Sequence, residues 1–167
     1  AEKRVTAKTK AIVPVHFAGL GVPNAALTDF AKRHNLRVIE DAAHSLPTIN
    51  EGTMIGGHGH AATVYSFYAT KTMTTGEGGM VVTPDRDLAK RMRTMRLHGI
   101  SRDVFDRYTS TKPSGQYDVV APGYKDNCTD TAAALGRVQL TRSDEMAAKR
   151  AAIAARYDAA LGGLPLV

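Results

Sequence analysis

Residues 63–83, with the sequence TVYSFYATKTMTTGEGGMVVT, constrain the fold of this chain more than any other stretch. Two β-branched and aromatic runs, at 63–67 and 80–83, have the composition of strands. The loop between them contains one lysine, Lys71, among several threonines and ahead of a glycine-rich run. Because this loop is too short to hold a crossover helix, we predict that the two strands pair in antiparallel fashion.

Lys71 is a candidate for covalent chemistry because of its neighbours. A lysine just beyond a strand end, with hydroxyl groups nearby and glycines that allow close backbone approach, suits Schiff-base formation beside a phosphate. A solvated loop lysine is the ordinary alternative, and Lys71 alone does not exclude it.

A second candidate site precedes this loop by about thirty residues in the sequence. Residues 36–39 form an apolar strand that ends in Glu40, Asp41 and, three residues later, His44. Ligands collect outside the carboxyl ends of parallel strands, so we expect Asp41 and Lys71 to project into one crevice. An amine for the aldehyde and an acid for the pyridinium nitrogen are what pyridoxal phosphate (PLP) requires. The spacing leaves open that Asp41 is instead a helix N-cap, with His44 on the following turn.

Three strings in a fixed order resemble the DegT/DnrJ/StrS family: IEDAAH at 39–44, SFYATKTMTTGEGGMVVT at 66–83 and RLHG at 96–99. The similarity extends from residue 9 to residue 140, which is nearly the whole chain. Members of this family are fold-type I, PLP-dependent aminotransferases that act mostly on nucleotide-linked keto-sugars. The resemblance implies an α/β fold, namely a fragment of the three-layer large domain, with a mixed sheet flanked by helices.

The resemblance also assigns roles to individual residues. Lys71 would hold PLP as an internal aldimine, and Asp41 would keep the ring nitrogen protonated. His44 falls where the family has a partner for the phenolic oxygen of the ring, and Ser66 falls at the phosphate. Lys125 stands where most members have an asparagine that reaches the cofactor phosphate of the neighbouring subunit. A plain surface lysine is equally compatible with the sequence at that position.

The partners that the resemblance implies are an amino-acid donor, glutamate in most of the family, a nucleotide-linked keto-sugar and a second subunit of a homodimer. A PLP-dependent sugar dehydratase of the same family is one alternative, but the best-known such enzyme carries histidine in place of the lysine. A non-catalytic relative that kept the fold is another alternative. Retention of Lys71, Asp41 and Ser66 together argues against it.

Composition excludes several other classes. The net charge is +6, but the basic residues are interleaved with acids, and no basic run with stacking aromatics indicates a nucleic-acid-binding module. Cys128 is the only cysteine, which excludes an internal disulfide and fits a cytoplasmic protein. No apolar stretch is long enough to predict a membrane span. His58 and His60 lack a third ligand nearby, so we predict no metal site.

Helical spacing follows Pro23, covers 85–97 and resumes after a cap at Thr129 or Asp130. The longest helix is expected to run from Asp144 to the glycines at 162 and 163. His16, at the end of the first predicted strand (residues 11–17), is expected to be a hydrogen-bonded histidine near the core. Residues 46–59 and 101–116 are predicted to be loops.

We expect residues 1–143 to form the core part of the PLP-binding large domain. Residues 144–167 would then lead towards a small C-terminal domain. Family members are considerably longer, and their glycine-threonine turn for the phosphate precedes residue 1. The sequence is therefore interpreted as a middle fragment that by itself binds PLP poorly and is inactive.

Overall fold

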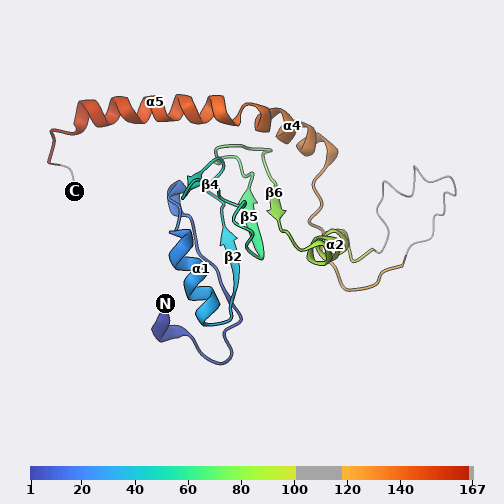
Figure 1. Ribbon diagram of the computed structural model, residues 1–167. Coiled ribbons are helices and arrows are strands. Elements are labelled where there is room, and N and C mark those ends of the chain that lie inside the picture. The colour runs from blue at the N-terminus through green and yellow to red at the C-terminus, as the bar shows by residue number, and fades with distance from the viewer. Residues whose placement is uncertain (101–117, 166–167) are drawn as a thin grey trace.

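The computed structural model describes residues 1–100 and 118–165. A four-stranded sheet in the order β1-β2-β5-β6 forms its centre (Figure 1). The strands are β1 (Ala11–Ile12), β2 (Arg37–Asp41), β5 (Ala62–Ser66) and β6 (Gly79–Val82). The first three are parallel, and β6 runs antiparallel to β5, as predicted for these two strands. The mixed sheet with flanking helices agrees with the expected α/β class.

Helix α1 (Asn24–Arg33) connects β1 and β2 and lies alongside the sheet (Figure 1). Its inward positions, Leu27 and Ala31, form one core cluster with Val38 of β2. Burying this apolar stripe against the sheet is what stabilises a helix of this length. The βαβ connection confirms that the first two predicted strands are parallel neighbours.

Strand β1 is shorter than the predicted strand at residues 11–17. Its ladder stops after Ile12 and resumes only as an isolated bridge between Val15 and Asp41. Pro14, which has no N–H to donate, interrupts the ladder between these two pairings. The chain then turns into the short 3₁₀ helix η2 (Phe17–Gly19). A similar helix, η1 (Glu2–Arg4), lies at the start of the chain.

The predicted loop at residues 46–59 contains a small hairpin that the sequence analysis missed. Its strands are β3 (Ile49–Asn50) and β4 (Thr53–Met54), joined by Glu51 and Gly52 with φ of 48° and 79°. Positive φ at both central residues is the backbone of a tight hairpin turn.

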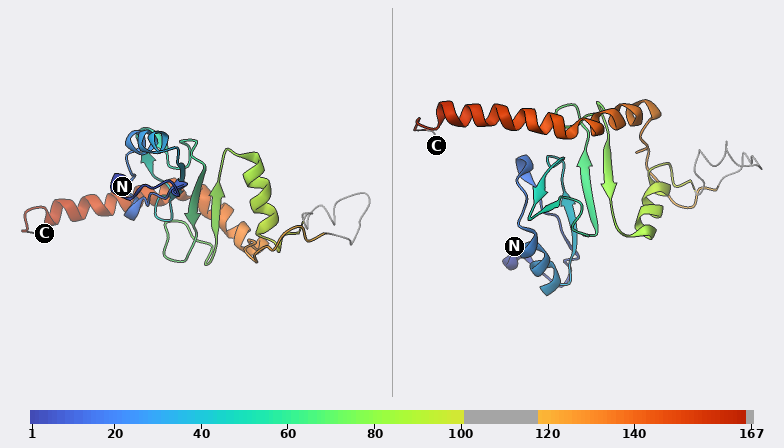
Figure 2. Two further views of the ribbon diagram at one scale, coloured as in Figure 1. Left: turned by 90° about the horizontal axis from the view of Figure 1, so that it is seen from below. Right: turned by 45° about the horizontal axis from the view of Figure 1, so that its top comes forward.

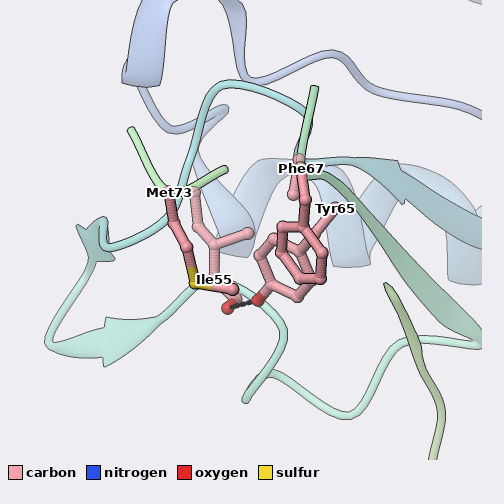
Figure 3. Close-up of a cluster of buried hydrophobic side chains, with 5 residues drawn as sticks. Ile55, Tyr65, Phe67 and Met73 are labelled. Carbon is pink, nitrogen blue, oxygen red and sulfur yellow. Dashed lines mark hydrogen bonds between the residues drawn. The ribbon is translucent and has the colours of Figure 1, made fainter. Parts of the chain in front are cut away.

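The hairpin delivers Ile55 into the second core cluster (Figure 3). That cluster also contains Ala42, Tyr65, Phe67 and Met73, and the Tyr65 hydroxyl donates a hydrogen bond to the Ile55 carbonyl.

Helix α2 (Arg86–Met95) lies within the predicted range of 85–97 and is capped by Asp85, whose Oδ1 accepts hydrogen bonds from the Asp87 and Leu88 amides, each at 2.9 Å. Gly99, shortly after this helix, has φ of 72°, and a Cβ there would clash with the Ala121 carbonyl. The apolar residues of this helix are half-buried rather than core residues.

Helices α4 (Asp130–Thr141) and α5 (Ser143–Leu161) cross the sheet beyond the upper ends of β2 and β5 in Figure 1, and Figure 2 shows the same arrangement. Thr129 caps α4 as predicted, by accepting from the Ala132 amide at 3.3 Å. Cys128, just before this helix, is exposed.

Within residues 1–100 and 118–165, no helix is both long and apolar enough to cross a membrane. The predicted loop at 101–116 lies outside the described residues.

Candidate active site

Strands β2 and β5 divide their side chains between two faces of the sheet. Glu40, Thr63 and Tyr65 point into the core and are buried. Asp41 lies opposite Val64 in the parallel register, so Asp41 and Ser66 share the other face. Both residues stand at the carboxyl ends of their strands and are half-buried.

The Asp41 backbone is fixed on one side by the first strand. Its amide donates to the Pro14 carbonyl at 2.9 Å, and its carbonyl accepts from the His16 amide at 3.0 Å. Its Oδ1 accepts from the Ala43 amide at 3.1 Å, which closes a turn. No helix follows, so the alternative of a helix N-cap is wrong. Oδ2 accepts no hydrogen bond from the described residues and is available to a ligand.

Lys71 lies in the loop that joins β5 and β6, and it is half-buried rather than fully solvated. Its amide donates to the Tyr68 carbonyl at 3.0 Å. The next residue, Thr72, donates its side-chain hydroxyl to the carbonyl of Leu46. Leu46 belongs to the segment after β2, so this bond ties the loops of Asp41 and Lys71 together at the same end of the sheet.

Two helices cover the Lys71 loop. A Cβ added at the buried Gly136 of α4 would lie 3.0 Å from Cγ2 of Thr75 and 3.7 Å from Cε of Met73. In α5, Nη2 of Arg150 donates to the Thr72 carbonyl at 3.4 Å. Helix α4 therefore packs closely at Gly136, where the absence of a side chain lets the helix approach the loop.

His44 is exposed at the turn that follows β2. Its Nδ1 accepts a hydrogen bond from the Ala18 amide at 3.2 Å, and the Phe17 ring meets it edge-on with centroids 5.8 Å apart. A backbone amide can only donate, so Nδ1 is the acceptor nitrogen and Nε2 carries the proton in the neutral ring. His44 therefore offers a ligand a hydrogen-bond donor.

Ser66 and Lys125 occupy different parts of the fold. Ser66 Oγ accepts from the Tyr68 amide at 3.3 Å, which leaves the hydroxyl proton free to donate. Lys125 is exposed, donates from Nζ to the Asn127 side chain and forms a backbone bridge with Leu97 beyond α2. The structure thus brings the segments of Asp41, His44, Ser66 and Lys71 to one edge of the sheet, while Lys125 is anchored beside α2.

His60, one of the loop histidines, is held within the fold by a side-chain partner. His60 Nε2 lies 2.9 Å from Asn24 Oδ1, and burial lowers the pKa of His60 below its usual range. Residues 1–100 and 118–165 contain no cluster of three or more histidine, cysteine, aspartate or glutamate side chains that could hold a metal ion.

Sequence reasoning overlooked one residue that lies next to the site. Glu40 is a carboxylate that is only 1% exposed, and it lies 3.1 Å from the equally buried His16. His16 is a hydrogen-bonded core histidine, as predicted. The inward position of Glu40 could have been predicted from the sequence, because side chains alternate between the two faces along β2.

The residues at the sheet edge fit the cofactor that the resemblance implies. Asp41 has a free carboxylate oxygen for a protonated ring nitrogen, and His44 has a donor for the phenolic oxygen. Ser66 has a hydroxyl for the phosphate, and Lys71 has an amine for the aldehyde. These are the groups that PLP requires of a protein.

Comparison with known proteins decides the family. The model of the DegT/DnrJ/EryC1/StrS aminotransferase family matches residues 1–167. The chain belongs to this family. It is 48% identical over 164 residues to the spore coat polysaccharide biosynthesis protein SpsC of Bacillus subtilis, covering 98% of this chain and 42% of that protein. The chain thus spans 42% of the length of this relative.

Solved structures of sugar aminotransferases have the same fold. Helicobacter pylori PseC, an aminotransferase of pseudoaminic acid biosynthesis, superposes with a TM-score of 0.88 at 32% identity, over 98% of this chain and 42% of that one. S. venezuelae DesV, in complex with a ketimine intermediate, gives 0.85 at 34% identity, over 98% and 41%. The PLP form of the putative sugar aminotransferase Spr1654 from Streptococcus pneumoniae gives 0.82 at 31% identity, over 97% and 44%. The expected family, fold and family cofactor are confirmed.

Proposed function

We propose that the complete protein is a PLP-dependent aminotransferase that moves an amino group from glutamate to a nucleotide-linked keto-sugar and uses Lys71 as its reactive amine. The observation that carries this proposal is the Thr72–Leu46 hydrogen bond, which joins the loop of Lys71 to the segment that follows Asp41. An amine and a carboxylate at one edge of a parallel sheet are placed as this chemistry requires.

Each residue has a distinct task in this proposal. PLP supplies an aldehyde that takes up amino groups and a pyridinium ring that accepts electrons. The Lys71 amine holds the cofactor and, once free, carries a proton to and from the substrate carbon. The free Oδ2 of Asp41 accepts a hydrogen bond from the ring nitrogen and favours its protonated form.

Two further donors hold the cofactor in place. The Nε2 proton of His44 is donated to the phenolic oxygen, and the Ser66 hydroxyl to the phosphate. Helix α4 packs through Gly136 on Met73 and Thr75 and so covers one side of the loop that carries Lys71. Lys125, which is exposed, serves the phosphate of the neighbouring subunit as a point charge in a homodimer.

The substrate class is supported by the names of the relatives. SpsC is a spore coat polysaccharide biosynthesis protein, and PseC is an aminotransferase involved in the biosynthesis of pseudoaminic acid, from which we infer that the substrate of this chain is a sugar. We place the activity in the cytoplasm, with which a single exposed thiol, at Cys128, is compatible.

The proposal is tested by product analysis with the complete protein. Glutamate carrying labelled nitrogen is supplied together with a panel of nucleotide-linked keto-sugars. The masses of the sugar products are then measured by mass spectrometry. We expect labelled amino-sugar from wild type and from Lys90→Ala, an exposed lysine of α2, and none from Lys71→Ala. A sugar product that has lost water without gaining nitrogen would instead identify a dehydratase.

A further inference from the structure

A buried polar group lies behind Asp41, on the opposite face of β2. His16, Glu40 and Thr63 are 1%, 1% and 2% exposed. Nε2 of His16 lies 3.1 Å from Oε1 of Glu40, and Oγ1 of Thr63 lies 2.5 Å from Oε2 of the same carboxylate. Glu40 and Asp41 are consecutive in the strand, so their side chains point to opposite faces while their backbones move together.

The hydrogen-bond pattern shows which atoms of this buried group carry protons. Nδ1 of His16 accepts from the Val22 amide at 3.1 Å, so the ring proton is on Nε2 and is donated to Glu40. Thr63 donates its hydroxyl proton to the other oxygen, so both oxygens of the Glu40 side chain accept a hydrogen bond. Among the described residues, His16 is the only basic side chain within 4 Å of this carboxylate. A buried carboxylate held in this way tolerates little displacement, because an oxygen left without a donor is costly.

The same histidine holds the backbone around the candidate active site. Its amide donates to the Asp41 carbonyl at 3.0 Å, and its carbonyl accepts from the hydroxyl of the buried Ser45 at 3.1 Å. Ser45 directly follows His44, so the His16 backbone contacts the segments that carry both candidate ring-binding side chains. Fixing the His16 ring through Glu40 therefore fixes the point at which these segments meet.

We infer that Glu40 is a positioning residue for the PLP site, which sets the placement of Asp41 and His44 through its bonds to His16 and Thr63. This inference rests on the proposed function, because Asp41 has a ring nitrogen to meet only if PLP binds at this edge. An aliphatic residue would fill the inward position of β2 without the desolvation cost of a carboxylate. A carboxylate there needs a role beyond filling space, and fixing the neighbouring site residues is such a role.

Thr63→Val in the complete protein is the sharpest probe, because it keeps the shape of the side chain and removes only the donor to Glu40. Thr63→Ser restores the hydroxyl, and Leu88→Ala, at a half-buried position of α2, is the control for a general loss of stability. We expect Thr63→Val to speed amide hydrogen exchange over residues 38–46 of the cofactor-free protein by about tenfold. We also expect it to weaken PLP binding by about tenfold, which equals about 1.4 kcal/mol. Thr63→Ser should recover most of both effects, and Leu88→Ala should lower only the melting temperature.

The inference fails if Thr63→Val behaves like Leu88→Ala, with a lower melting temperature but unchanged exchange over 38–46 and unchanged PLP affinity. The exchange measurement needs no cofactor, so it remains informative whatever the protein binds. If wild type itself takes up no PLP, the proposed function is refuted. The exchange comparison then still decides whether Glu40 fixes the segment of Asp41 and His44.

Discussion

The side chain of Thr72 donates a hydrogen bond to the backbone carbonyl of Leu46, and this bond joins the two loops that carry the candidate catalytic groups. We predict that Thr72→Val lowers the free energy of unfolding of the complete protein by about 1 kcal/mol, the usual net contribution of one such bond. Its effect on turnover should be larger than its effect on stability, because a displaced amine loses alignment with the substrate. Thr70→Val, at an exposed position of the same loop, is the control for both measurements. Equal behaviour of the two variants would show that the link between the loops is unimportant.

Asp41→Asn separates the electrostatic role of this side chain from its structural role. Asparagine keeps an oxygen that can accept from the Ala43 amide, so the turn and the melting temperature should be retained. Loss of the negative charge should leave PLP bound but lower kcat by about 100-fold or more, as removal of other preorganised electrostatic groups does. Glu77→Gln, at an exposed acid in the loop before β6, should keep full turnover. Undiminished turnover by Asp41→Asn would remove the electron-sink role.

The strand–loop–strand pattern of residues 63–83 was sufficient to predict both strands and their antiparallel pairing, because alternation and loop length are local properties. The location of the candidate active site could be predicted from the order of the elements, since the carboxyl ends of parallel strands lie on the same side of the sheet. The hairpin at 49–54 was missed because strands of two residues leave no periodicity to detect. Pro14 within the first predicted strand was a local warning that its ladder would be interrupted.

The polar group behind Asp41 could be predicted only in part. The inward position of Glu40 follows from alternation along β2, but its partners do not follow from the sequence. His16 lies 24 residues away, and Thr63 lies on another strand, so their meeting depends on the register of three strands. The free Oδ2 of Asp41 and the protonated Nε2 of His44 likewise depend on backbone amides that only the folded chain brings into place.

His60 gives the stability of the protein a predictable dependence on pH. Burial lowers its pKa from the ordinary value of 6.5, so near that pH the folded protein binds fewer protons at His60 than the unfolded chain does. Stability therefore rises with pH in this range: the contribution of His60 is complete above 6.5 and is lost as the pH falls through its folded pKa. His60→Gln keeps a donor for Asn24 but cannot titrate. We expect the melting temperature of His60→Gln to fall less than that of wild type between about pH 7.5 and about pH 5.5. Parallel curves for the two proteins would contradict this.

Lys125 yields a test of the shared active site. If its amine serves the neighbouring subunit, each active site combines Lys71 of one subunit with Lys125 of the other. Lys71→Ala and Lys125→Ala then remove groups that different subunits contribute to the same site. Both pure variants should be nearly inactive. Mixed dimers would contain one site with both lysines intact, so equal mixing should restore about a quarter of the wild-type activity. Native mass spectrometry of the mixture is the control for exchange, since full exchange should make about half of the dimers mixed. If activity is not restored although the subunits have exchanged, Lys125 is a surface lysine without a role in the neighbouring site.

The identity of the reactive amine is the most direct test of the account. The complete protein is loaded with PLP, reduced with borohydride to fix any covalent link, digested and mapped by mass spectrometry. We predict a pyridoxyl group on Lys71 at near-stoichiometric level and its loss in Lys71→Ala. Stoichiometric labelling of another lysine, or retention of cofactor by the variant on a different residue, would contradict the proposed site.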